Sequence, residues 1–138
     1  MPQATKPLPH IDRWTRPFWE ACRERRLVMQ KCGSTGKFWF PPGPVSPFTR
    51  TSNWDWSSLS GRGRIASYII MHQVYFDGFA DEVPYSIVQI ELAEGPLMIS
   101  NLVGVPLDRI TVGMSVRVVF DAGPDGWTIP KFALLEAT

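Results

Sequence analysis

Apolar and β-branched residues recur in short segments through the second half of the chain, and turn-forming residues separate these segments. Such runs predict β-strands, which we place at 64–72, 85–92, 97–103, 115–121 and 128–134. The connector 104–114, between the third and fourth predicted strands, has room for only about one helical turn, at 106–110. Five strands with a connector at that point are typical of a small Greek-key barrel of the OB type. A generic five-stranded sheet is the competing interpretation.

The first half of the chain combines one helical pattern with short apolar runs. A helix is predicted from about 15 to 26, because Pro17 suits a first helical turn and because Phe18, Trp19 and Cys22 fall on one side of it. Short strands are predicted after the helix, at 27–30, 37–40 and 54–56.

The segment 31–56 has the outline of a zinc ribbon in which only Cys32 is left as a ligand. A ribbon needs four soft ligands that converge tetrahedrally on the metal. With Cys32 as the first ligand, the spacing puts the others at Thr35, Ser46 and Thr49, whose neutral hydroxyls are poor zinc ligands beside a thiolate. We therefore predict a knuckle without zinc that is held by proline stiffening, contact with a partner and the packing of Phe38, Trp39, Phe40, Phe48, Trp54 and Trp56.

These patterns predict a mainly β fold in three parts. An extended N-terminal arm covers 1–14, a helix with a metal-free, rubredoxin-like knuckle covers 15–58, and a five-stranded OB-fold barrel covers 59–138. The small, polar, turn-forming segment 57–62, SSLSGR, marks the break between knuckle and barrel.

Composition narrows the class of protein. Of 138 residues, 44% are hydrophobic and 20% are charged, near globular averages, which argues against disorder. No apolar run approaches the roughly 20 residues of a membrane helix, and the N-terminus lacks the apolar core of a signal peptide, so we expect a cytoplasmic protein without membrane contact. A net charge of +1 argues against bulk duplex DNA as a partner. The two cysteines are too few for a disulfide framework.

Tryptophan and proline are unusually frequent, with 6 and 13 residues, and most of the tryptophans lie in the first half of the chain. Aromatic residues are favoured at interfaces, so we expect that the front part does not close a core by itself. The candidate residues for a partner interface are Trp14, Phe18, Trp19 and Trp39.

The longest predicted loop, 73–84, contains three aromatic and three acidic residues. Loops of this length are usually either functional or disordered. Phe76 and Phe79 flank the turn pair Asp77-Gly78, and their rings either project toward a partner or ligand or fold back as a lid on the barrel.

The sequence contains no catalytic motif of a common kind, such as G-x-S-x-G, H-E-x-x-H, C-x-x-C or a Gly-rich phosphate loop. Asp81 and Glu82 beside Tyr85 are the best acid–base candidates, but adjacent acids in an extended segment point to opposite sides. His72 is more simply a hydrogen-bonding residue at a strand end, and Cys22 a small buried hydrophobe. We therefore predict no catalytic residues and no catalysis by this chain alone.

Motifs at four places follow one another in a characteristic order: FWFPPGP at 38–44, GRG at 61–63, VPY at 83–85 and GMSVRVVF at 113–120. Together they resemble the DUF35 family, the ChsH2-type or acyl-CoA-associated OB-fold proteins. The resemblance extends from Pro17 to about Leu134.

The resemblance implies an N-terminal helix, a rubredoxin-like zinc ribbon and an OB barrel. It also implies a hetero-oligomer with a thiolase-fold enzyme that handles acyl-CoA thioesters, such as a thiolase or an aldolase of lipid or steroid catabolism. In such complexes the partner carries the catalytic residues, while the DUF35 chain stabilises the enzyme and shapes or binds the acyl-CoA site. The family's ribbon usually has four cysteines, at positions 32, 35, 46 and 49; three are replaced here, so the family's zinc is not carried over.

An enzyme in its own right stays open from the sequence, chiefly if Asp81, Glu82 or His72 enters a partner's site. Two non-catalytic functions stay open as well. One is a free-standing protein that binds acyl-CoA or nucleotides. The other is a barrel that binds single-stranded nucleic acid on stacking aromatics, which the near-neutral charge disfavours. The candidate contacts to acyl-CoA or to a partner are Arg23, Arg25, Arg26, Arg62, Arg64, Phe76, Phe79, Asp81, Glu82 and Tyr85.

Overall fold

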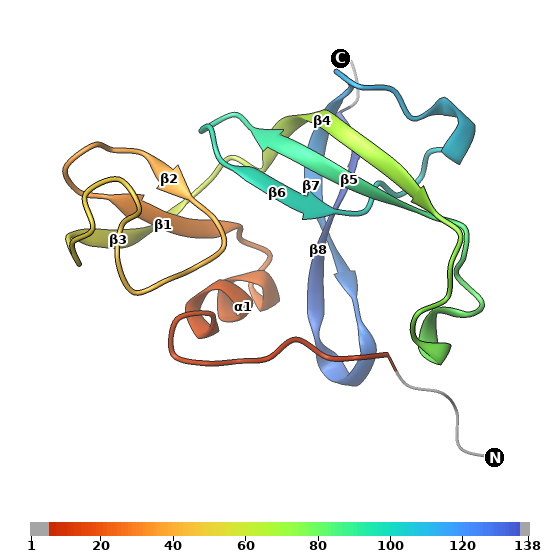
Figure 1. Cartoon of the computed structure of the whole chain (residues 1–138), viewed down its shortest axis with the longest axis horizontal. Helices are drawn as coiled ribbons and strands as arrows, with labels where there is room; N and C mark the ends of the chain where they lie inside the picture. Colours follow the sequence, from red (N-terminus) through yellow and green to blue (C-terminus); the bar gives the residue numbers. More distant parts are fainter. Residues whose placement is uncertain (1–5, 136–138) are drawn as a thin grey trace.

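The computed structural model describes residues 6–135, which form a small sheet and a barrel joined through one helix (Figure 1). The helix is α1 (Arg16–Arg23). The strands are β1 (Val28–Cys32), β2 (Phe38–Trp39), β3 (Trp54–Ser58), β4 (Arg62–Met71), β5 (Tyr85–Leu92), β6 (Leu97–Ser100), β7 (Ser115–Ala122) and β8 (Thr128–Leu134). Short 3-10 turns lie in the connections, at η1 (Asp77–Phe79), η2 (Leu107–Arg109) and η3 (Pro124–Gly126).

The small sheet has the order β2-β1-β3, with both pairs antiparallel. Its central strand β1 is buried at every position except Lys31. Gln30 of β1 lies opposite Trp39 on one side and Trp56 on the other. Because β1 occupies the centre, the outer edge of β3 has no neighbouring strand among the described residues.

The second sheet has the order β6-β5-β4-β7-β8, with every neighbouring pair antiparallel. Two glycines let β4 start close to its neighbours. A Cβ on Gly61, whose φ is +79°, would lie 2.4 Å from the Val118 side chain, and a Cβ on Gly63 would lie 2.6 Å from the carbonyl oxygen of Glu91. These close approaches explain why glycine occurs at both positions of the GRG sequence, where the first barrel strand begins.

The sheet curls until residues 101–103, which follow β6, meet the other outer strand, β8. The Phe132 N–H donates to the carbonyl oxygen of Asn101 at 3.0 Å, and the Val103 N–H donates to the carbonyl oxygen of Phe132 at 2.8 Å. A parallel bridge between Leu102 and Phe132 marks the same contact. Closure of this kind satisfies the edge groups that an open sheet would expose.

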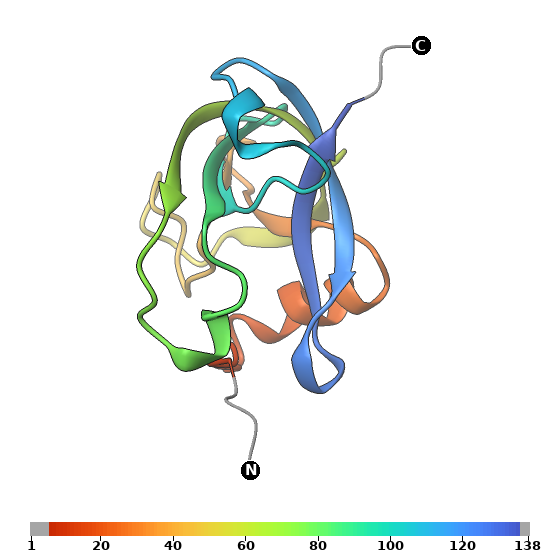
Figure 2. The same ribbon diagram turned by 90° about the vertical axis from the view of Figure 1, so that its right-hand side faces the viewer.

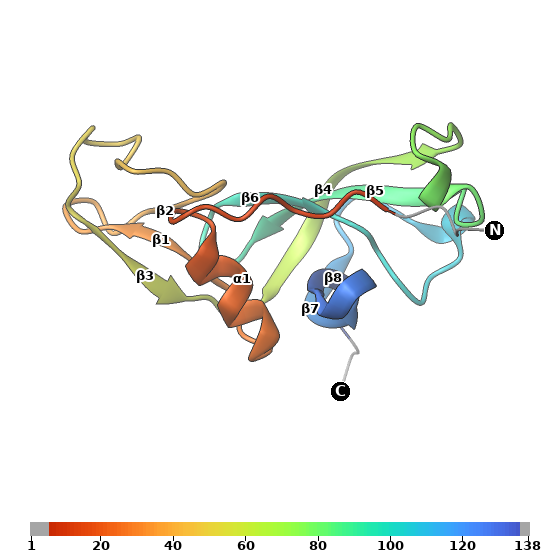
Figure 3. The same ribbon diagram turned by 90° about the horizontal axis from the view of Figure 1, so that it is seen from below.

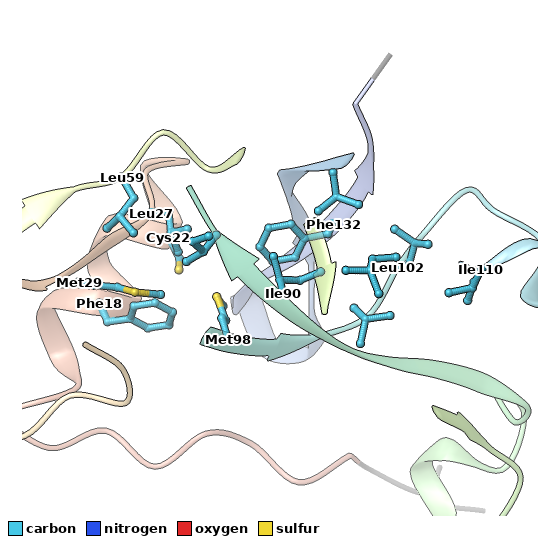
Figure 4. Packing of buried hydrophobic residues seen from close by; sticks show 14 residues of the cluster. Phe18, Cys22, Leu27, Met29, Leu59, Ile90, Met98, Leu102, Ile110 and Phe132 are labelled. Carbon is cyan, nitrogen blue, oxygen red and sulfur yellow. The ribbon is translucent and has the colours of Figure 1, made fainter. Parts of the chain in front are cut away.

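One hydrophobic core connects the helix, the small sheet and the barrel. Figure 4 shows Phe18, Cys22 and Met29 on one side of it and Ile90 and Phe132 on the other. All five are buried. The front part of the chain therefore completes its core only by packing against the barrel, as the sequence predicted.

The N-terminal arm extends from α1 beside the barrel toward the loop that follows β4 (Figure 3). Its Lys6 pairs with Glu82 and lies 5.4 Å from the centre of the Phe79 ring. Residues 1–5 of the predicted arm and 136–138 of the predicted barrel segment lie outside the described residues.

The prediction of a mainly β protein with an OB-type barrel is confirmed. Two boundaries differ for physical reasons. The helix ends at Arg23, not near Arg26, because Arg25 adopts a φ of +60°. The third barrel strand ends at Ser100, not at 103, because residues 101–103 leave β5 to pair with β8. None of the helices described is long and apolar enough to cross a membrane.

Candidate functional site

The knuckle brings two of the other predicted ligand positions, Thr35 and Ser46, near Cys32. Cys32 ends β1 and is 1% exposed, and Ser46 is fully buried beside it. Both turns of the knuckle keep backbone hydrogen bonds, from Gly36 N–H to the carbonyl oxygen of Cys32 at 2.9 Å and from Arg50 N–H to that of Ser46 at 2.7 Å. The Ser46 and Thr35 hydroxyls act on the Cys32 thiol closely enough to lower its pKa. Three of the four ligand positions of a ribbon, at Cys32, Thr35 and Ser46, are therefore close together in the structure.

The donor groups at these positions do not fit zinc. One thiol faces neutral hydroxyls, which are weak zinc ligands. Ser46 Oγ accepts a hydrogen bond from Phe48 N–H at 3.2 Å, and Thr49 Oγ1 lies 2.9 Å from Thr51 Oγ1, so these hydroxyls have partners within the protein. Across residues 6–135 no group of three or more His, Cys, Asp or Glu side chains is placed to hold a metal ion.

The two thiols have opposite surroundings. Hydrogen bonds from Ser46 and then Thr35, against the opposing effect of burial, lower the pKa of Cys32 from 9.0 to about 6. Burial raises the pKa of Cys22 to about 12. Cys22 is thus a core residue, whereas neighbouring hydroxyl groups favour the charged form of Cys32.

Aromatic packing and one buried amide hold the knuckle. The Trp54 ring has edge-to-face neighbours in Trp14, Trp39 and Trp56, with centroids 6.1 to 6.4 Å away. The Gln30 side chain accepts a hydrogen bond from Gly43 N–H at 2.8 Å and donates one to the Gly43 carbonyl oxygen, which fixes the proline-rich loop to β1. The sequence predicted the aromatic contribution but not that of Gln30, because a glutamine in a short apolar run carries no signal of its partner.

A cavity of about 250 Å³ is lined by α1 and by the tip of the β7–β8 hairpin. Figure 2 shows this hairpin beside the helix. Two indoles meet there, since the rings of Trp19 and Trp127 lie 5.3 Å apart in an edge-to-face arrangement. The rest of the lining combines one apolar residue with charged side chains and a glycine: Ile11, Arg16, Glu20, Arg23, Asp125 and Gly126.

Apolar side chains cover part of the outer face of the barrel. Along β5 the residues alternate strictly between buried and partly exposed, and Ile87 is on the exposed side. Ile69 of β4 lies opposite Ile87, while Ile99 and Leu97 of β6 lie opposite Gln89 and Glu91 on the same side. The exposed fractions of Ile69, Leu97 and Ile99 are 55%, 47% and 66%. We call the set Ile69, Ile87, Leu97 and Ile99 the outer apolar patch.

The two phenylalanines of the loop after β4 lie in different surroundings. Phe76 is exposed, whereas Phe79 packs 6.0 Å from the Tyr85 ring. Glu82 is paired with Lys6, and Asp81 is exposed. These acids form no catalytic pair with each other.

The predicted arginine contacts are distributed over the surface. Arg23 lines the cavity beside Trp19, and Arg26 pairs with Glu24 at 3.0 Å. Arg64 pairs with Glu91 at 3.3 Å. Arg25 and Arg62 are exposed at the end of α1 and the start of β4.

The residues predicted for a partner interface differ in how deeply they are buried. Phe18 is 3% exposed in the core, and Trp39 is buried within the knuckle. Trp14 and Trp19 are half-buried. The outer apolar patch was missed, because its members come from three strands and only the register places them on one face.

Comparison with known proteins gives two family matches. The model for the ChsH2 rubredoxin-like zinc ribbon domain matches residues 19–45, and that for the ChsH2 C-terminal OB-fold domain matches residues 56–121. A DUF35 domain-containing scaffold protein of Pyrococcus furiosus is 31% identical over 74% of each chain. The chain belongs to the DUF35 family.

Two further relatives of this DUF35 protein carry more specific descriptions. A solved structure described as "Ltp2-ChsH2(DUF35) aldolase" matches with a TM-score of 0.83 and 35% identity, over 92% of this chain and 98% of that one. A probable enoyl-CoA hydratase alpha subunit of Thermomonospora curvata is 36% identical over 95% of this chain. The DUF35 chain spans only 40% of that relative's length.

Replacing the three hydroxyl residues with cysteine, in Thr35→Cys/Ser46→Cys/Thr49→Cys, is expected to create a zinc site, because the backbone turns are already formed. Metal analysis should find about one zinc per chain in this variant and none in the wild type, and a chelator should lower the melting temperature of the variant alone. The same variant with Cys32→Ala is the control. Stoichiometric zinc in the wild type would contradict the assignment.

The lowered pKa of Cys32 predicts that stability rises with pH. Because the folded thiol binds its proton less tightly than the unfolded one, the stabilisation is fully present above 9.0 and is lost as the pH falls through about 6. Denaturant midpoints measured across this window should rise in the wild type and rise less in Ser46→Ala, with Ser57→Ala as the control. If the denaturation midpoint of Cys32→Ala rises with pH as steeply as that of the wild type, the pH dependence of stability comes from other groups.

Proposed function

We propose that this chain is an accessory subunit of an enzyme complex that acts on acyl-CoA thioesters, with a thiolase-fold partner carrying out the chemistry. The observation that carries the proposal is the outer apolar patch on the barrel. Almost the whole of the ChsH2(DUF35) chain in an aldolase complex has its counterpart here, which supports a binding role of the same kind.

The patch lies where OB folds commonly bind their ligands. In this barrel the second and third strands are β5 and β6, and the face of these strands is the general binding surface of the fold. Three of the four patch residues are exposed isoleucines or leucines. Exposed apolar groups gathered on one face mark an interaction site more strongly than scattered ones.

The chemistry of the face favours a protein over a nucleic acid. Single-stranded nucleic acids need a basic groove with stacking aromatics. Arg64 on this face forms an ion pair with Glu91, so the positive charge of Arg64 is balanced within the protein. An apolar protein surface therefore complements the patch better than a phosphate backbone does.

The side chains considered for catalysis do not converge. Cys22 is in the core, and His72 is exposed at the end of β4. A nucleophile and its base must lie within hydrogen-bonding distance of each other. This separation supports a partner as the source of the catalytic residues.

Ile99→Glu is expected to weaken association with the partner, because it places a charge in a face that becomes desolvated. Using the Ltp2 subunit of the aldolase complex as the probe, calorimetry should show a loss of at least about tenfold in affinity, or about 1.4 kcal/mol. Val112→Glu, at a residue that is 57% exposed outside the patch, is the control. Equal affinity of the two variants and the wild type would contradict a docking role for the patch.

A second candidate function, direct contact with the nucleotide end of acyl-CoA, is favoured by the cavity beside α1. Its paired indoles offer an apolar wall for a purine ring, and the guanidinium groups of Arg16 and Arg23 lie on the same lining. Arginine is well suited to phosphate because of its planar set of donors. The carboxylates of Glu20 and Asp125 limit how much anionic charge the cavity accepts.

Trp127→Ala is expected to reduce binding of coenzyme A at this cavity by about tenfold, because it removes one of the two indoles. Calorimetry with coenzyme A measures the change, and Trp56→Phe, in the small sheet, is the control. Wild-type binding that is unaffected by Trp127→Ala would place coenzyme A elsewhere, and no binding would remove this candidate.

A further inference from the structure

The free edge of β3 presents backbone groups that no other strand uses. Gly33 N–H donates to the carbonyl oxygen of Asn53, and Leu59 N–H donates to that of Leu27, both at 2.9 Å. In an antiparallel pair, hydrogen-bonded residues alternate with residues whose N–H and C=O point away from the partner. In β3 the backbone groups of Trp54, Trp56 and Ser58 therefore point outward.

Two of these outward N–H groups already have local partners. Trp56 N–H donates to its neighbour Asp55 Oδ1 at 2.8 Å, and Trp54 N–H donates to the Ser52 carbonyl oxygen at 3.0 Å. The Ser58 N–H has no acceptor among the described residues, and the outward carbonyls have no strand beside them. The edge is thus most open at its C-terminal end.

A groove of about 260 Å³ accompanies this end of β3. One wall is α1, through residues that include Pro17, Glu20 and Ala21. The other is the small sheet, through Val28 of β1 and through Trp56 and Ser58 of β3. Figure 3 shows the helix beside the end of β3. A groove with a free strand edge on one side offers main-chain hydrogen bonds to an extended peptide.

We propose that an extended segment of the thiolase-fold partner adds to β3 as a further strand and lies in this groove. The inference rests on the proposed function. Main-chain hydrogen bonds to Ser58 and to the outward carbonyls would give the segment its register, and the exposed part of Trp56 would give it an apolar contact.

Charge indicates the composition of the segment. Glu20 and Glu24 face the groove with Arg26, and Arg26 is paired with Glu24 at 3.0 Å. One carboxylate, on Glu20, is left without an ion pair among the described residues. A segment with a basic side chain opposite Glu20 complements this charge, whereas a second β3 edge, which brings the same carboxylates, does not.

The decisive variant is Ser58→Pro, because proline removes the outward N–H without touching the bonds between β3 and β1. Ser58→Ala, which keeps the N–H and loses only the hydroxyl, is the matched control. With the Ltp2 subunit as the probe, we expect Ser58→Pro to weaken affinity by about tenfold and Ser58→Ala by less than about twofold. Glu20→Lys should weaken it several-fold.

Hydrogen exchange on the wild-type chain gives a second readout that does not depend on folding of the proline variant. Addition of Ltp2 should slow exchange of the Ser58 amide, while the Ser57 amide, which already faces β1, stays unchanged. Binding with no protection of Ser58 and equal affinities of the Ser58 variants overturns strand addition and leaves the proposed function intact. Absence of any wild-type binding overturns both, and dimerisation of the chain alone that Ser58→Pro abolishes would assign the edge to a second copy.

Discussion

The structure depends on the burial of one face of α1 against the barrel. Phe18 and Cys22 project from the helix into the same core as Ile90 and Phe132 of the barrel. The strands of the small sheet are short, with five residues in β1 and two in β2. They cannot bury enough apolar surface for the small sheet to fold alone. Because the small sheet and the barrel share the helix, their outer surfaces are held in a fixed relation.

This shared core also explains how a ribbon tolerates the loss of its ligands. A structural zinc normally supplies much of the folding free energy of such a knuckle. Here α1 packs against the central strand β1. The Gln30 amide fixes the proline-rich loop at Gly43 to the same strand, and the rings around Trp54 pack against one another in the knuckle. The remaining thiol, Cys32, is buried, and the hydroxyls of Ser46 and Thr35 lower its pKa.

The surfaces that we assign to binding lie on different elements around this shared core. The outer apolar patch belongs to the barrel, the indole-lined cavity to the junction of α1 with the β7–β8 hairpin, and the free edge to the small sheet. A subunit that has to hold a partner in one orientation gains from contacts at separate points, since each restricts a different rotation. Contacts at separate points fit the accessory role that we propose for this chain.

Local patterns in the sequence determined much of this protein. Alternation and turn residues placed β5 and β8 at their observed bounds, and the ligand positions of the knuckle followed from spacing alone. The tertiary structure decided what depends on pairing between distant segments: that residues 101–103 close the barrel, that Ser46 reaches Cys32, and that Ile69 and Ile99 share a face. It also decided that Phe18 is a core residue and that β3 is an edge. A sequence shows which residues can be buried or paired, but only the register between strands far apart in the chain shows which of them are.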